Sequence, residues 1–161
     1  MISIITADLT DEYHEAALIE LMDVYASGIM GGGRGLSTFT KTHLAPELHK
    51  RSYLFTLLAF DSTRPVALAN CVEGFSTFAC KPLVNIHDLV VAEEYRGRGI
   101  AFDLLSAVEN EATKRGCCKI TLEVLEGNAP AQNLYRKFGF TSYTLNQETG
   151  QALFWEKPLN Q

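Results

Sequence analysis

The sequence predicts an α+β fold built on a mixed, largely antiparallel sheet with a parallel β-α-β unit at its centre. Two observations lead to this prediction. An apolar run at 84–91, a helical run at 100–115 and an alternating run at 119–125 form a strand-helix-strand unit, whose strands must be parallel with a right-handed crossover. Apolar runs at 53–60 and 66–75 flank the turn-forming segment DSTRP, which is typical of an antiparallel hairpin.

One strand and two helices precede this hairpin. Residues 3–7 are expected to form the strand, and Thr10 is a suitable cap for the next helix. The buried face of that helix is predicted from near-helical spacing at Tyr13, Ala17, Leu21 and Val24. The glycine-rich residues 31–35 should form a loop. A second helix is expected over 39–50, where Pro46 argues for a break or a late start.

The elements after the hairpin follow from periodicity and from glycine and proline positions. The chain should break near Lys81 and Pro82 before the strand at 84–91. The next helix starts at Gly99, ends at Gly116, and should bury Ile100, Leu104, Leu105, Val108 and Ala112. A short helix is expected over 130–139. Two last strands, at 141–145 and 151–157, would flank a turn.

Whole-chain properties are those of one globular domain over residues 1–161. Hydrophobic residues make up 47% of the chain and charged residues 20%, and no apolar run approaches the ~20 residues of a membrane span. Without a signal-peptide pattern, a cytoplasmic location is the expectation, with no membrane partner. A net charge of −5 without clustered Lys and Arg argues against nucleic acid. The four cysteines lack metal-ligand spacing, so we expect free thiols and no metal.

The most informative segment joins the strand at 84–91 to the following helix, and it comprises Arg96, Gly97, Arg98, Gly99, Ile100 and Ala101. The first N–H groups of a helix have no intrahelical partner and lie at the positive end of its dipole, so a phosphate fits there. Two glycines let a ligand approach the main chain. The spacing matches neither the dinucleotide fingerprint, since Phe102 stands where a third small residue is needed, nor the P-loop.

The remaining pattern, Arg/Gln-x-x-Gly-x-Gly/Ala, resembles the acetyl-CoA-binding motif of the GNAT superfamily of acyltransferases. The segment NAPAQNLY at 128–135 and the segment FGF at 138–140 resemble the second cofactor segment of that superfamily. The resemblance implies helices on both faces of the sheet and splayed central strands. It also implies that acetyl-CoA is the acyl donor, with its pyrophosphate on residues 96–101.

The resemblance assigns further roles. The backbone N–H of Leu89 would polarise the thioester carbonyl, and the main chain of Leu89, Val90 and Val91 would pair with the pantetheine arm. Asn128 would bind the cofactor or fix the loop before its helix, and both roles agree with a helix cap. Acceptor specificity would come from the N-terminal helices and from the loop at 27–37, where three glycines indicate a mobile lid or a flexible connection.

Tyr135 is the candidate general acid by its position in the motif. A phenol with a pKa of about 10 can protonate a thiolate whose conjugate acid has a pKa of about 8.5. The other interpretation is a core aromatic, because Ala131, Leu134, Tyr135 and Phe138 have helical spacing.

The general base has several candidates. Histone acetyltransferases carry a glutamate at the position of Asn85, which cannot act as a base, whereas arylalkylamine acetyltransferases carry a histidine at the position of His87. Glu73 or a water relay would be the next choice, and His87 could equally be structural. Strict alternation would place Asn85, His87 and Leu89 on one face of the strand, and Ile86, Asp88 and Val90 on the other.

Together these observations predict an acetyl-CoA-dependent N-acetyltransferase that acts on a primary amine of a small molecule or peptide by direct attack. The alternative is a catalytically silent acyl-CoA-binding or sensing module. Edge strands near the C-terminus could pair between subunits to form a homodimer.

Overall fold

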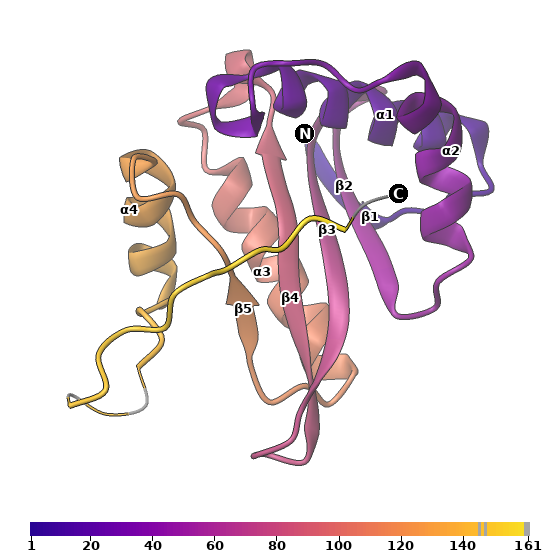
Figure 1. Cartoon of the computed structure of the whole chain (residues 1–161). Coiled ribbons are helices and arrows are strands. Elements are labelled where there is room, and N and C mark those ends of the chain that lie inside the picture. The colour runs from indigo at the N-terminus through magenta and orange to yellow at the C-terminus, as the bar shows by residue number, and fades with distance from the viewer. Residues whose placement is uncertain (145, 147, 160–161) are drawn as a thin grey trace. The chain divides into compact units, whose positions relative to one another are not determined.

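The computed structural model describes residues 1–144, 146 and 148–159. The chain separates into two compact parts, an N-terminal unit (Met1–Leu122) and a C-terminal unit (Glu123–Gln161), which are described separately below (Figure 1). No helix among the described residues combines the length and the apolar character that crossing a bilayer requires.

The N-terminal unit contains a five-stranded sheet in the order β1-β2-β3-β4-β5 (Figure 1). All neighbouring strands are antiparallel except β4 and β5, which are parallel, so the predicted α+β fold class is confirmed. The parallel pair lies at one edge of the described sheet and not at its centre as predicted. The strands are β1 (Ile2–Thr6), β2 (Leu54–Asp61), β3 (Arg64–Ser76), β4 (Lys81–Val91) and β5 (Ile120–Leu122). The helices are α1 (Glu12–Ser27), α2 (Thr38–His49) and α3 (Ile100–Lys114), with short 3-10 turns at η1 (Ile29–Gly31) and η2 (Glu93–Tyr95).

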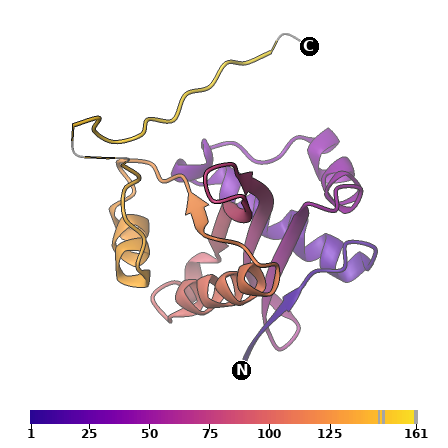
Figure 2. The ribbon, with the colours of Figure 1, turned by 90° about the horizontal axis from the view of Figure 1, so that it is seen from below.

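The helices cover both faces of this sheet, as expected from the family resemblance. On one face α1 and α2 pack on alternate strand residues, and this core cluster includes Ala17, Leu18, Leu21, Ala45, Leu58, Leu68 and Val90. On the other face α3 packs against β2, β3 and β4 and buries the five apolar residues predicted for it. Figure 2 shows α3 and α2 on opposite sides of the strands.

The start and buried face of α1 differ from the prediction. Asp11 is the cap, since its side chain accepts hydrogen bonds from the backbone N–H groups of Tyr13 and His14. Thr10 instead donates its hydroxyl to Asp8, at 2.6 Å. The buried residues are Ala17, Leu18 and Leu21, whereas Tyr13 and Val24 are about half exposed. The apolar stripe is therefore narrower than predicted and includes Leu18.

Two prolines lie inside regular elements that the sequence predicted they would interrupt. Helix α2 continues through Pro46, next to the fully buried Ala45 that anchors it in the core cluster. Strand β4 begins at Lys81 and includes Pro82, which pairs with Phe75 and accepts a hydrogen bond from Cys118 N through its carbonyl. The break falls instead before Lys81, where Cys80 has a positive φ of 48°. In both cases tertiary pairing and packing outweigh the missing proline donor.

The C-terminal unit contains α4 (Ala129–Phe138), close to the predicted helix, with Gly139 as its cap at φ 113°. The two predicted last strands are wrong over the described residues. Only an isolated bridge joins Thr144 and Gln151 there, beside a hydrogen bond from Ala152 N to Tyr143 O. Residue 145, the end of the first predicted strand, lies outside the described residues. The predicted strand at 119–125 is likewise shortened to β5, whose three residues pair with β4.

Candidate active site

The connection from β4 to α3 is built around two glycines in the left-handed region of backbone space. Gly97 has φ 74° and Gly99, the cap residue of α3, has φ 86°. A side chain at either position would be strained by these dihedral angles. A Cβ atom at either glycine would meet no heavy atom within 4 Å, so the space beside this backbone is open.

This conformation leaves five consecutive backbone N–H groups, those of residues 97–101, without an acceptor in the part of the chain that the structure describes. The next two N–H groups, those of Phe102 and Asp103, both donate to Gly99 O. Unpaired N–H groups at a helix N-terminus attract anions through their partial positive charge. The segment can therefore bind a phosphate or pyrophosphate by its main chain.

The arginines of this segment are held by neighbouring groups. Arg96 donates its Nε–H to Val91 O at 3.2 Å, which ties the segment back to the end of β4. The guanidinium of Arg98 lies 4.8 Å from the centre of the Tyr95 ring. Tyr95 is fixed in turn by a hydrogen bond from its hydroxyl to Asp61. The two guanidinium groups add positive charge around the segment, and their contacts hold its conformation.

Beside this segment, β4 offers an open main-chain edge. Strand β5 pairs only with residues 84–86, and beyond Ile86 no other described strand of the N-terminal unit pairs with β4 on that side. Ala92 N donates to Val66 O of β3, so alternation along the antiparallel ladder directs the N–H groups of Leu89 and Val91 away from β3. The N–H of Leu89 is therefore available to an extended ligand lying along this edge.

Strand β4 contains a β-bulge at His87. Asn70 pairs with Asp88, and the next residue of β3 pairs with Ile86, so His87 is the extra, exposed residue. The predicted strict alternation is consequently wrong. Asn85 and Leu89 pair with β3 residues three positions apart and lie on opposite faces, while Asn85 and Asp88 share the face that packs on α1. One inserted residue leaves no mark in the hydrophobic pattern, so the sequence could not show it.

Glu73, the other candidate base, forms an ion pair on the face of the sheet opposite to α1. Its Oε2 is 3.0 Å from Arg115 Nη1, and Arg115 also binds Glu111 and lies over the ring of Phe55. The Glu73 carboxylate is thus already engaged by a guanidinium partner. Among the described residues no three His, Cys, Asp or Glu side chains cluster as metal ligands would.

A hydrogen-bonded row of polar side chains, not predicted from the sequence, crosses the sheet on the α1 face. Thr56 on β2 donates its hydroxyl to Asn70 Oδ1 at 2.7 Å, and Asn70 on β3 donates Nδ2 to Asp88 Oδ2 on β4 at 2.9 Å. Thr56 and Asn70 are buried. Burial, followed by the charge of Asp88, raises the pKa of the Tyr25 phenol. The available signal was a polar residue at matching positions of two otherwise apolar strands.

The remaining predicted site residues lie in the C-terminal unit. Asn128 caps α4, because its side chain accepts a hydrogen bond from Ala131 N at 3.3 Å. Gln132 fixes the loop before the helix through bonds to the carbonyls of Leu125 and Glu126. Tyr135 is half-buried and makes an edge contact with Phe140, at 5.8 Å between ring centres.

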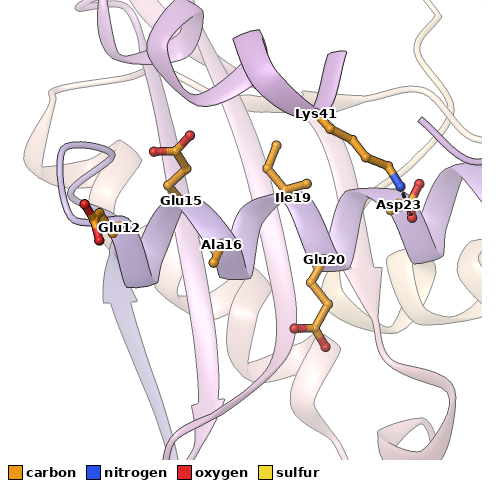
Figure 3. A pocket seen from close by; sticks show the side chains of 7 residues that line it. All are labelled: Glu12, Glu15, Ala16, Ile19, Glu20, Asp23 and Lys41. Atoms are coloured by element: carbon orange, nitrogen blue, oxygen red, sulfur yellow. Dashed lines mark hydrogen bonds and ion pairs between the residues drawn. The ribbon is translucent and has the colours of Figure 1, made fainter. Parts of the chain in front are cut away.

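An acidic groove of about 550 Å³ runs along α1 (Figure 3). Its lining residues are Glu12, Glu15, Ala16, Ile19, Glu20 and Asp23 of α1 and Lys41 of α2, which pairs with Asp23 at 2.7 Å. The groove includes none of the predicted site residues. The loop between the two helices, predicted to be a mobile lid or a flexible connection, contains the turn η1 and is held by hydrogen bonds such as the one from Leu36 N to Asp23 Oδ1.

Comparisons with known proteins agree with this arrangement. The sequence model of the acetyltransferase (GNAT) family matches residues 14–140. Streptothricin acetyltransferase of Escherichia coli is 41% identical over 137 residues, which are 84% of this chain and 75% of that protein. Bovine (Bos taurus) thialysine N-epsilon-acetyltransferase is 34% identical over 61 residues, 38% of this chain and 36% of that protein.

Among solved structures, aminoglycoside N-acetyltransferase AAC(6′)-Iy in complex with CoA has the same fold, with a TM-score of 0.74 at 18% identity over 98% of this chain and 95% of that one. The family match covers most of the chain, and it includes the segment of unpaired N–H groups, the open edge of β4 and helix α4. The chain therefore belongs to the GNAT family of acetyltransferases.

Proposed function

We propose that this protein is an acetyl-CoA-dependent N-acetyltransferase that transfers an acetyl group to a primary amine of a small molecule or peptide. The observation that carries the proposal is the row of five unpaired N–H groups at residues 97–101, directly after a strand with an open edge. Donors in this arrangement suit a pyrophosphate joined to an extended arm.

The donor would bind through main-chain groups. The N–H groups of Gly97, Arg98, Gly99, Ile100 and Ala101 would hold the pyrophosphate, with charge from Arg96 and Arg98. The arm would lie along Leu89–Val91, and the Leu89 N–H would donate to the thioester carbonyl. An oriented N–H at this carbonyl stabilises the negative charge that develops on its oxygen during amine attack.

The side chains would move protons. An amine with a pKa of about 10.4 is mostly charged at neutral pH and must lose a proton before it attacks. His87, exposed on the bulge of β4, is our candidate base, acting directly or through water. Tyr135 is our candidate acid for the departing thiolate, and Asn128 supports the loop that precedes its helix.

The balance of the step is that of direct acyl transfer. A C–N bond forms between the amine and the acetyl carbonyl carbon, and the C–S bond breaks. The ammonium loses one proton to His87 or water before it attacks, and the nitrogen loses a second proton by the same route after the C–N bond forms. The thiolate receives a proton from Tyr135, which regains one from water. The printed names of the relatives support an amine acceptor, since they concern streptothricin, thialysine and aminoglycosides. The family match spans residues in both units, which supports a single functional domain.

The test is the release of free CoA from acetyl-CoA, followed with a thiol reagent across a panel of primary amines. The expected result is amine-dependent release together with an acetylated amine found by mass spectrometry. Saturable binding of acetyl-CoA without acetylation of any panel amine would instead support the silent acyl-CoA-binding module. No binding of acetyl-CoA would overturn the proposal altogether.

A further inference from the structure

Asp88 of β4 is half-buried and, unlike Asp23, Glu73 and Glu111, has no cationic partner among the described residues. Asp23 is paired with Lys41, and Glu73 and Glu111 are both paired with Arg115. No Lys, Arg or His of the described residues lies within 4.0 Å of the Asp88 carboxylate. A partly desolvated carboxylate without a counter-charge gains free energy when a cation binds it.

The carboxylate is also held in one orientation. Asn70 Nδ2 donates to Asp88 Oδ2 at 2.9 Å and contacts Met22 Sδ at 3.3 Å, so the amide is fixed between β4 and α1. Thr56 donates to Asn70 Oδ1 at 2.7 Å, and this contact determines which end of the amide faces Asp88. Asp88 accepts the hydrogen bond from Asn70 through Oδ2, and its Oδ1 accepts no hydrogen bond from the described residues.

The place of Asp88 in β4 relates this free oxygen to the proposed reaction. Asp88 directly precedes Leu89, whose N–H lies on the open edge, so the two α-carbons are about 3.8 Å apart. The bulge at His87 turns Asp88 toward α1 and α2, the helices that the family resemblance associates with the acceptor. The half-buried phenol of Tyr25 on α1 lies near the same carboxylate.

We propose that Asp88 binds the ammonium group of the acceptor, and that Asn70 and Thr56 are positioning residues that aim its free oxygen. This inference rests on the proposed function and narrows it, since it makes a cationic amine the preferred acceptor. Asp88 holds the acceptor cation beside Leu89 until the amine loses its proton to His87 or to water.

The first experiment compares steady-state kinetics of Asp88→Asn with the wild type, using the best amine of the panel. Asparagine keeps the shape and still accepts the bond from Asn70, but it loses the charge. We expect the KM for the amine to rise about 10- to 100-fold, and the KM for acetyl-CoA to change less than about twofold, because a charge-assisted hydrogen bond is lost. Glu20→Gln removes an exposed carboxylate of α1 and should leave both KM values unchanged.

Binding of an unreactive probe provides a readout besides turnover. The N,N-dimethyl form of the same amine carries an N–H⁺ group, and the matching isopropyl compound is its neutral isostere. The wild type should prefer the cation about tenfold by calorimetry, and Asp88→Asn should lose this preference. Equal binding of both compounds by the wild type would overturn the inference.

The positioning role is tested on Thr56. Thr56→Val should raise the amine KM severalfold with little change in kcat, and Thr56→Ser should restore it, because serine keeps the hydroxyl. An Asp88→Asn enzyme with the wild-type amine KM would refute the role of Asp88 while leaving the proposed function intact. A wild-type protein that acetylates no amine would refute the proposed function itself.

Discussion

Gly97 and Gly99 show how two residues without side chains create the central feature of the site. Their positive φ angles turn the chain so that the N–H groups of residues 97–101 have no internal acceptor. The side chains of this motif are secondary, since Arg96 and Arg98 contact Val91 and Tyr95. Substitutions that change the backbone conformation at the glycines therefore test the candidate site better than substitutions that remove the arginine charges.

Gly99→Ala should weaken acetyl-CoA binding about fivefold or more, because a left-handed alanine costs about 1 kcal/mol and the N–H groups turn away to relieve it. Gly116→Ala is the matched control at the other end of α3, with φ 70° and equally open space. Both variants should lower the melting temperature similarly, and only Gly99→Ala should change the Kd in calorimetry. Equal effects on the Kd would refute the proposed binding mode.

Tyr135→Phe should lower kcat about 100-fold while the KM for acetyl-CoA changes little, because the variant removes a proton donor and keeps the ring. The contact with Phe140 is apolar and survives the change. A variant with wild-type kcat, under conditions where thiolate protonation limits the rate, would assign Tyr135 to the core instead.

The cysteines should differ sharply in reactivity. Burial raises the pKa of the Cys71 thiol to about 12, whereas Cys80 and Cys118 are exposed. Iodoacetamide at pH 8 should label the two exposed thiols of the native protein and should reach Cys71 only after denaturation, as read by mass spectrometry. The neutral Cys71 thiol favours the folded state below pH 9, and this contribution decreases as the pH rises from about 9 to about 12. Rapid native labelling of Cys71 would contradict its burial.

At the scale of elements, the sequence predicted long amphipathic or apolar segments well. Helix α3 buries the five residues expected from their spacing, because its pattern has one strong apolar face. The prediction of the buried face of α1 was less accurate, since Tyr13 and Val24 fit the spacing but are about half exposed. Cap choice between Thr10 and Asp11 depends on local hydrogen bonds that spacing does not encode.

The candidate site was predictable only where a motif fixes the backbone. Residues 97–101 were identified from two glycines before a helix, and the structure places unpaired N–H groups there. The bulge at His87 and the row from Thr56 through Asn70 to Asp88 depend on register between strands, which a single sequence does not specify. Glu73 illustrates the same limit, because its pairing with Arg115 joins residues far apart in the chain.

The packing of α3 on the sheet gives a stability prediction for this element. Leu104→Ala should lower the free energy of unfolding by about 2–5 kcal/mol, since the side chain is fully buried and its removal leaves a cavity. Glu109→Ala on the exposed side of the same helix should change it by less than about 0.5 kcal/mol. Urea denaturation measures both values, and similar losses for the two variants would show that α3 does not pack as described.

At the scale of the whole molecule, the family match runs from α1 to the end of α4 and spans both units. The N-terminal unit contains the unpaired N–H groups of residues 97–101, and the C-terminal unit contains Tyr135 and Asn128. The identity of the chain as a GNAT acetyltransferase thus agrees with the sequence motif, with the fold and with the relatives. The motif itself carries no information about the acceptor.

The most direct test of the account observes every backbone amide while acetyl-CoA is added. In two-dimensional NMR with hydrogen exchange, the amides of residues 97–101 and of Leu89 should shift and become protected from exchange, because each gains an acceptor. The amides in the middle of α1 should keep their exchange rates and thereby serve as the internal reference. Saturable binding of acetyl-CoA that leaves the amides of 97–101 unshifted and unprotected would contradict the proposed site.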